Sequence, residues 1–157
     1  MGQPNFTHPH LPESQPESPY QLATEDGRTF QGWLAHYGNP HFVTFVEQDP
    51  MTMALTYGAD LETNARFPDR ANISFVRVLD DTLEAVVFER GVGITQACGT
   101  GACAIGVAAI RAGYRNFESP ISVRLPGGVL KITITTSYDT TMNGPSMPVF
   151  KGEVSGV

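Results

Sequence analysis

The sequence predicts an α+β domain in which a barrel-like mixed sheet is wrapped around one central buried helix. Short apolar segments alternate with strong turn signals along most of the chain, a pattern typical of strands joined by tight turns. One later segment is apolar on every side of a helix, which predicts burial on every side. The 157 residues are enough for one domain with a substantial core.

The first 19 residues are expected to form an extended arm ahead of the folded domain. Residues 1–20 hold five of the twelve prolines and no Lys or Arg. Because proline lacks a backbone N–H, this composition disfavours a helix or a central strand. The domain itself is expected over residues 20–147, followed by a final strand within residues 148–157.

Three hairpins are expected, each with a turn signal between two apolar segments. Asp26-Gly27 marks the first, Asp80-Asp81 the second and Pro126-Gly127-Gly128 the third. The expected strands are Tyr20–Thr24 with Thr29–His36, Ile73–Leu79 with Leu83–Phe88, Ile121–Leu125 with Val129–Thr136, and single strands at Phe42–Val46 and Pro148–Val154. About seven or eight strands are therefore expected in all.

The clearest helix is expected at about Thr100–Gly113, where small apolar residues surround the axis. A second helix is expected for part of Thr52–Ala65. In the helix expected at about Thr100–Gly113, Cys103 would lie about 140° around the helix axis from Cys98. We therefore expect Cys103 to belong to the core.

Composition limits the classes of partner. The formal net charge of −6 argues against nucleic acid and anionic membranes, which favour a basic face. No apolar run approaches the roughly 20 residues that a membrane span needs, and the first residues lack the pattern of a signal peptide. We expect a cytoplasmic protein whose two cysteines are free thiols.

Cys98 is the leading candidate for chemistry because it stands at the expected start of the buried helix. The first N–H groups of a helix have no internal partner and carry partial positive charge, so they stabilise a thiolate or an oxyanion. We expect the pKa of Cys98 to lie below its ordinary value. The alternative is a small buried cysteine in a turn. A Cys98–Cys103 metal pair lacks further ligands nearby in sequence, so neither a metal nor a cofactor is expected.

Five further residues are candidates for binding or for tuning the thiol. Glu89 and Arg90 end a strand, where Arg90 suits a carboxylate and Glu89 an ammonium group, although an exposed ion pair is the alternative. Asn39 and Asn72 stand where strands begin, and ordinary turn chemistry would explain both. His41 is expected to titrate near neutrality and so to influence a thiol.

Several segments, in order along nearly the whole chain, resemble diaminopimelate epimerases. They are GNPHFVTFV at 38–46, FPDRANISFV at 67–76, ERGVGITQACGTGACA at 89–104, LPGG at 125–128, and NGP followed by FKGEV within 143–154. The CGTG turn alone is also similar to that of proline racemases, and the GNPH and ERGVG segments narrow the resemblance. It implies a cofactor-independent enzyme that interconverts LL- and meso-diaminopimelate in lysine biosynthesis.

The resemblance also implies roles for single residues. Cys98 would donate or accept a proton at one face of the α-carbon, and the N–H groups of Gly99 and Thr100 would hold the α-carboxylate. Asn39, Asn72, Glu89 and Arg90 would contact the substrate, while His41 and Glu89 would help to set the pKa of the thiol.

The family departs from this chain in one respect, since its second catalytic thiol comes from a first domain with an ECGNG-type turn. No such turn occurs here, and the start, MGQPNF, resembles the family's inter-domain strand. We therefore expect a C-terminal half whose final strand would return to the first domain, with that domain a candidate partner encoded separately. A homodimer stays open, as do two other hypotheses: a different thiol enzyme using Cys98 and His41, and an inactive fragment or binding module.

Overall fold

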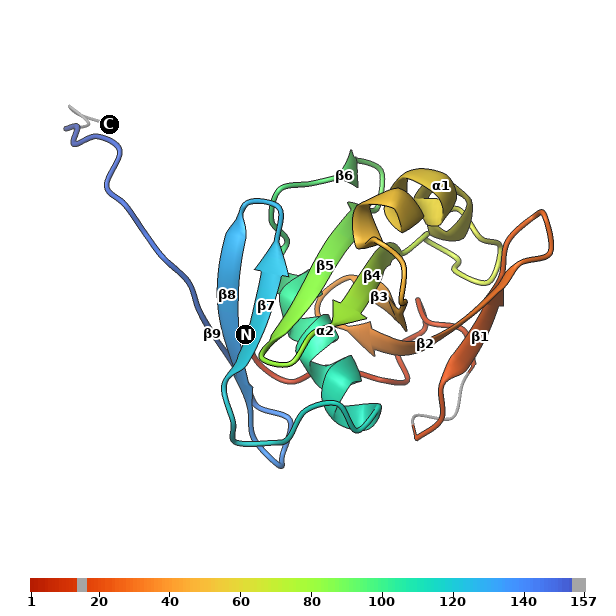
Figure 1. Cartoon of the computed structure of the whole chain (residues 1–157), viewed down its shortest axis with the longest axis horizontal. Coiled ribbons are helices and arrows are strands. Elements are labelled where there is room, and N and C mark those ends of the chain that lie inside the picture. Colours follow the sequence, from red (N-terminus) through yellow and green to blue (C-terminus); the bar gives the residue numbers. More distant parts are fainter. Residues whose placement is uncertain (14–16, 154–157) are drawn as a thin grey trace.

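The computed structural model describes residues 1–13 and 17–153, which form one sheet and two helices. The strands are β1 (Tyr20–Ala23), β2 (Thr29–His36), β3 (Pro40–Phe45), β4 (Asn72–Val78), β5 (Thr82–Glu89), β6 (Gly93–Ile94), β7 (Ile121–Leu125), β8 (Gly128–Ile134) and β9 (Thr140–Asn143), and the helices are α1 (Pro50–Glu62) and α2 (Gly99–Arg111). The sheet runs in the order β1-β2-β3-β4-β5-β7-β8-β9, and β6 pairs with β5. The fold is therefore a mixed sheet with two helices (Figure 1).

The two helices lie on opposite faces of the sheet, and the strand directions explain why. The parallel pairs β3–β4 and β5–β7 are each joined through a helix, and the antiparallel pairing of β4 with β5 reverses the direction between them. Because such crossovers are right-handed, reversing the strands moves the second helix to the other face. On β5, Val86 packs in the cluster of α1, whereas Ala85 and Val87 pack in that of α2.

Helix α2 is buried because its residues are small. Residues 101–109 are all buried, and α2 contacts β2, β3, β4, β7, β8 and β9. A Cβ added to Gly106 would lie 3.1 Å from Ile132 and from Ile134, so β8 approaches the helix closely at this glycine. The expectation that Cys103 is a core residue is confirmed, since none of its surface is exposed.

Helix α1 begins with a strong capping signal that sequence analysis left unused. The Asp49 side chain accepts the backbone N–H of Thr52 at 2.8 Å, and Pro50 occupies the first helical turn. Gly58 allows α1 to approach β5, because a Cβ there would lie 2.4 Å from the Phe88 ring. These contacts position the strand end that carries Glu89.

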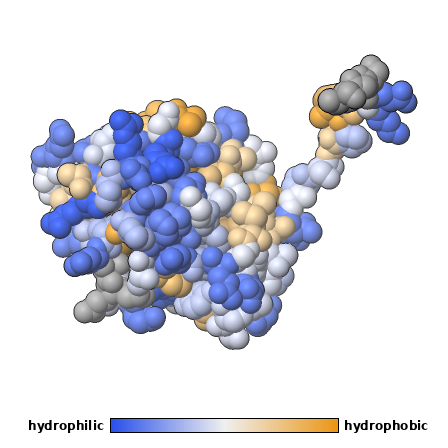
Figure 2. Space-filling view, turned by 180° about the vertical axis from the view of Figure 1, so that it is seen from behind, coloured by the Kyte–Doolittle hydropathy of each residue, from blue (hydrophilic) through white to orange (hydrophobic). Residues whose placement is uncertain are grey.

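The three predicted hairpins and both predicted helices are present. In β8, Ile132 and Ile134 are buried and Lys131 is exposed. Strand β9 was not predicted. Conversely, residues 148–153 form no strand and are exposed, and residue 154 lies outside the described residues. This segment projects away from the body of the molecule (Figures 1 and 2), so the described part gives it no neighbouring strand to pair with.

The first 13 residues of the arm run along the domain. Gly2 forms a bridge with Thr140, and Asn5 forms one with His36 through two backbone hydrogen bonds of 2.9 Å. Leu11 is buried in the cluster beside α1. In the part of the chain that the structure describes, neither helix has the length and apolar character needed to cross a bilayer.

Candidate functional site

Cys98 is the residue that caps the N-terminus of α2. Its extended backbone lets the side chain turn back over the helix end, where the Gly101 N–H donates to Sγ at 3.3 Å. The Thr100 hydroxyl lies 3.7 Å from the same sulfur. Cys98 is 6% exposed and is a free thiol, as is Cys103. The thiol therefore stands where the sequence predicted it, directly before the first helical N–H groups.

The pKa of Cys98 is raised, and the prediction of a lowered pKa is wrong for this structure. Burial is the largest cause, because it disfavours the charged thiolate. The hydrogen bonds from Thr100 and Gly101 act in the opposite direction, and the negative charge of Glu89 raises the pKa further. The helix end is present, but desolvation outweighs it. Before any ligand binds, Cys98 is a neutral thiol at pH 7.

Glu89 stands at the end of β5 with its carboxylate directed toward the start of α2. Its Oε1 accepts the Thr95 hydroxyl at 2.6 Å, which fixes the carboxylate between β6 and the helix. The influence of Glu89 on the pKa of Cys98 indicates that the two groups are neighbours. The structure thus brings a thiol and a carboxylate together, as the sequence suggested.

The backbone at Gly99 and Thr100 forms the first turn of α2. Both residues are half-buried, and their N–H groups have no acceptor inside the helix. A Cβ added to Gly99 would lie 3.4 Å from the Met142 side chain, so β9 covers part of this helix end. Met142 was missed by sequence analysis because β9 carries no clear alternation of apolar and polar residues.

His41 differs from expectation. It is fully buried on β3, and burial lowers its pKa to about 3, so the ring stays neutral at physiological pH. Its Nε2–H donates to Asn39 Oδ1 at 2.9 Å, while Nδ1 has no hydrogen bond among the described residues. The prediction that His41 titrates near neutrality is wrong. A direct hydrogen bond between His41 and the Cys98 thiol is likewise not formed.

Asn72 joins two of the other candidate segments. It lies beside His41 on the parallel strands β3 and β4 and is buried. Its side-chain N–H donates to the Pro40 carbonyl at 3.0 Å, and its Oδ1 accepts the Arg90 backbone N–H at 3.0 Å. Asn72 therefore positions the GNPH turn against the ERGVG turn, and turn chemistry alone does not describe it.

Arg90 is exposed, and its guanidinium donates to the Asp69 backbone carbonyl at 3.0 Å. No carboxylate side chain is bonded to it among the described residues. The structure thus links Asn39, His41, Asn72 and Arg90 in one chain of contacts, which reaches Cys98 through Glu89, the sequence neighbour of Arg90.

Glu62 supports the site and was also missed. It is the last residue of α1, is 4% exposed, and accepts the Gly91 backbone N–H on Oε1 at 2.9 Å. Arg70 lies 3.5 Å from the same carboxylate. A charged residue at a helix end normally indicates an exposed position, so no sequence signal distinguished it.

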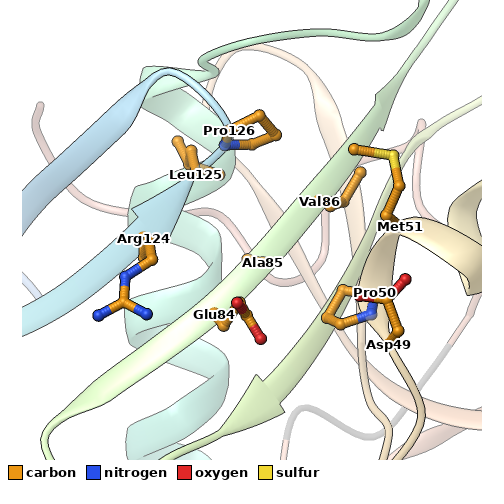
Figure 3. A pocket seen from close by; sticks show the side chains of 9 residues that line it. All are labelled: Asp49, Pro50, Met51, Glu84, Ala85, Val86, Arg124, Leu125 and Pro126. Atoms are coloured by element: carbon orange, nitrogen blue, oxygen red, sulfur yellow. The ribbon is translucent and has the colours of Figure 1, made fainter.

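The hollow drawn in Figure 3 lies elsewhere. It has a volume of about 280 Å³ and is lined by residues of α1, β5 and β7, including Glu84 and Arg124. Helix α2 passes behind the sheet in this view. None of the candidate residues lines the hollow, so it is distinct from the site around Cys98.

Known proteins match this chain over most of its length. The family model described as diaminopimelate epimerase matches residues 33–149. The chain is 41% identical over 155 residues to a diaminopimelate epimerase of Sphingopyxis alaskensis, covering 98% of this chain and 57% of that protein. It is 38% identical over 157 residues to one of Stutzerimonas stutzeri, with coverage of 98% and 56%. The chain thus spans a little over half the length of these relatives.

Solved structures with low sequence identity share the fold. A hydroxyproline epimerase from Agrobacterium vitis, with bound trans-4-hydroxy-L-proline, aligns with a TM-score of 0.56 at 14% identity, covering 84% of this chain and 45% of that one. A probable proline racemase from Agrobacterium radiobacter aligns with a TM-score of 0.54 at 12% identity, covering 90% and 47%. These two likenesses concern the fold alone. The family model over residues 33–149, together with relatives 41% and 38% identical over 98% of the chain, identifies the chain as a member of the diaminopimelate epimerase family.

Proposed function

We propose that this chain supplies one face of the proton-transfer site of a cofactor-independent diaminopimelate epimerase. One observation carries the proposal: the Cys98 thiol caps α2, accepts the Gly101 N–H and lies beside the Glu89 carboxylate. The relatives named diaminopimelate epimerase support the substrate. Because the chain spans a little over half of those relatives, the whole reaction is part of the proposal.

Inversion of a stereocentre needs two groups on opposite faces of the carbon, one to remove a proton and one to deliver another. Cys98 is one such group. Cys103 is fully buried in the core cluster, and burial raises its pKa to about 12, so it is a poor second base. We infer that the second thiol belongs to a first domain, either joined to this one or encoded separately.

The raised pKa of Cys98 suggests its starting role. A neutral thiol has a proton to give, so Cys98 would protonate the α-carbanion after the opposite thiolate has removed the original proton. The products are a thiolate at Cys98, a thiol on the other face and the inverted α-carbon, so protons balance. The reverse reaction begins with Cys98 as the thiolate, and binding of a cationic ammonium group near Glu89 would favour that form.

The remaining candidates would hold the substrate. The N–H groups of Gly99 and Thr100 would receive the α-carboxylate at the helix end. Arg90, with its free donors, would pair with a carboxylate, and Asn39 would contact the substrate from the GNPH turn. Asn72 would contribute its remaining amide N–H and keep Arg90 in place.

We also propose that the sheet wraps around α2 as a barrel-like wall, which the contacts of α2 with six strands support. Residues 148–153, which have no partner strand in the described part, would pair with the first domain. Two free buried thiols suit the reducing cytoplasm, where this pathway would operate.

The alternative of a Cys98–His41 thiol enzyme lacks support. His41 Nε2 is bonded to Asn39, and Nδ1 has no hydrogen bond to any group in residues 1–13 and 17–153, so neither nitrogen is bonded to the thiol. The decisive test measures exchange of the α-proton and epimerisation of diaminopimelate in deuterated water. The 157-residue chain would be assayed alone and with a first domain from a close relative. We expect turnover only in the mixture, abolished by Cys98→Ala and largely retained by Cys103→Ala.

Three outcomes would contradict the proposal. Epimerisation at full rate by the chain alone would overturn the need for a second domain. Activity in the mixture that survives Cys98→Ala would remove Cys98 from the reaction. If the mixture binds substrate but neither exchanges nor epimerises, the chain is a binding module or an inactive fragment.

A further inference from the structure

Three histidines from distant parts of the sequence meet at the start of the domain. His8 and His10 come from the arm and His36 from the end of β2, and the nearest ring nitrogens of the three lie within 4.8 Å of one another. The His8 ring stacks on that of His36 with centroids 3.6 Å apart, and the His8 and His10 rings meet edge to face at 4.7 Å. No motif in the sequence indicates this cluster, because the three histidines come from separate segments.

The cluster is held in place on both sides. The two backbone hydrogen bonds between Asn5 and His36 fix the arm to the end of β2. Beyond the histidines, the Leu11 N–H donates to the His8 carbonyl at 2.8 Å, and the Leu11 side chain is buried. The arm therefore presents His8 and His10 toward His36 in a closed turn and does not merely pass by it.

His36 carries the observation that points to a ligand. Its residue is only 8% exposed, and Nε2 has no hydrogen-bond partner among the described residues. A buried polar nitrogen without a partner is costly, and native structures rarely leave one unsatisfied.

We propose that His8, His10 and His36 form a binding site for a divalent transition-metal ion, with zinc as the ion used to test it. Three imidazoles with an open fourth position are a recognised zinc arrangement. Tetrahedral zinc holds nitrogen ligands about 3.4 Å apart, so binding would require the rings to close by roughly an ångström. The stacked rings of His8 and His36 would turn about their side-chain bonds to do so.

Asp69 completes the arrangement as a positioning residue. Its Oδ2 lies 3.0 Å from His10 Nε2, so His10 would bind the ion through its other nitrogen. A carboxylate behind a metal-binding histidine orients the ring and raises its basicity. The Asp69 carbonyl also accepts the Arg90 guanidinium, so an ion here would stiffen the segment that holds Arg90. The metal site is separate from Cys98, and the proposal does not depend on the epimerase function.

The test is zinc titration of the full chain, prepared without a histidine tag and freed of metal, by calorimetry. We expect one ion per chain and a rise in melting temperature with zinc, both lost in His8→Ala/His10→Ala. Asp69→Asn should weaken binding about 10- to 100-fold. Glu13→Ala, an exposed change on the same arm, is the matched control and should bind zinc like the wild type.

Cobalt(II) substitution distinguishes the ligands. A site of imidazoles should give visible bands without the strong thiolate-to-cobalt band in the near ultraviolet. Zinc binding that survives His8→Ala/His10→Ala and disappears in Cys98→Ala would overturn the proposal, since the thiol would then be the ligand. So would wild-type binding no stronger than that of the double variant, provided that both melt at the same temperature without metal.

Discussion

Gly101→Ala should raise the pKa of the Cys98 thiol while changing the free energy of unfolding only slightly. Gly101 donates its N–H to Cys98 Sγ, and a Cβ added there would lie 3.0 Å from that sulfur and 3.2 Å from Val87 Cγ2. Contacts this short require the neighbours to move by a few tenths of an ångström. The sulfur sits on the N-cap residue, so it is the neighbour that can shift, and moving it lengthens the N–H···S bond.

The expected stability change is small because two effects oppose each other. Overpacking a buried site typically destabilises by about 1–3 kcal/mol. Replacing glycine by alanine inside a helix stabilises by about 1 kcal/mol. The net loss is therefore about 0–2 kcal/mol, which corresponds to a fall of at most about 8 °C in melting temperature for a chain of this length.

Gly106→Ala is the matched control, since it lies on the same helix with an equally tight environment against Ile132 and Ile134. It should lower the free energy of unfolding by a similar amount without contacting the thiol.

The assay follows the ¹³Cβ signal of labelled cysteine against pH. Because the pKa of Cys103 is about 12, a signal that titrates earlier belongs to Cys98. We expect Gly101→Ala to raise the pKa of Cys98 further, and Gly106→Ala to leave it unchanged. Identical titrations in the two variants would refute the reasoning.

Two other predictions concern buried groups outside the thiol. The pKa of His41 is about 3 in the folded chain, against an ordinary value of 6.5 in the unfolded chain. Between these two pH values the unfolded chain binds a proton that the folded chain does not. His41 should therefore lower the free energy of unfolding by up to about 1.4 kcal/mol per pH unit as the pH falls from about 6.5 toward 3. Urea unfolding at several pH values should show a shallower slope for His41→Gln, and an unchanged slope would mean that the ring is accessible to protons. Glu62→Ala should destabilise by about 1–3 kcal/mol and speed hydrogen exchange at the Gly91 amide, with a smaller effect for Glu62→Gln, which keeps an acceptor. Unaltered exchange at Gly91 in Glu62→Ala would show that the carboxylate does not hold that turn.

Local signals in the sequence were enough to predict the hairpins and α2. Asp26-Gly27 and Pro126-Gly127-Gly128 act over a few residues, and the apolar circumference of α2 is visible in the sequence itself. Strand β9 was missed because Thr140, Thr141 and Asn143 are polar. It forms because β8 offers it an unpaired edge, which is a tertiary property.

The electrostatics of the candidate site differ from what the sequence predicted. The resemblance named Cys98, Glu89 and His41, and the structure places them at the start of α2, at the end of β5 and on β3. The sign of the thiol pKa depends on how much water the neighbours exclude, and burial also makes His41 too weak a base to titrate near neutrality. The burial of Glu62 and the meeting of His8 with His36 likewise follow from the path of the chain and not from any motif.

The reversal of direction between β4 and β5 has a consequence for the way the chain reaches this fold. Each parallel pair can close only after a helix has crossed the sheet, and the two helices must cross on opposite sides. The hairpins can form early within short stretches of chain, whereas the β3–β4 and β5–β7 registers must wait for these long excursions. The Cys98 cap is local to α2, but the burial of the thiol against β5 and β7 depends on that crossover. A chain stalled before the crossover would already possess β1, β2 and β3 but no buried thiol.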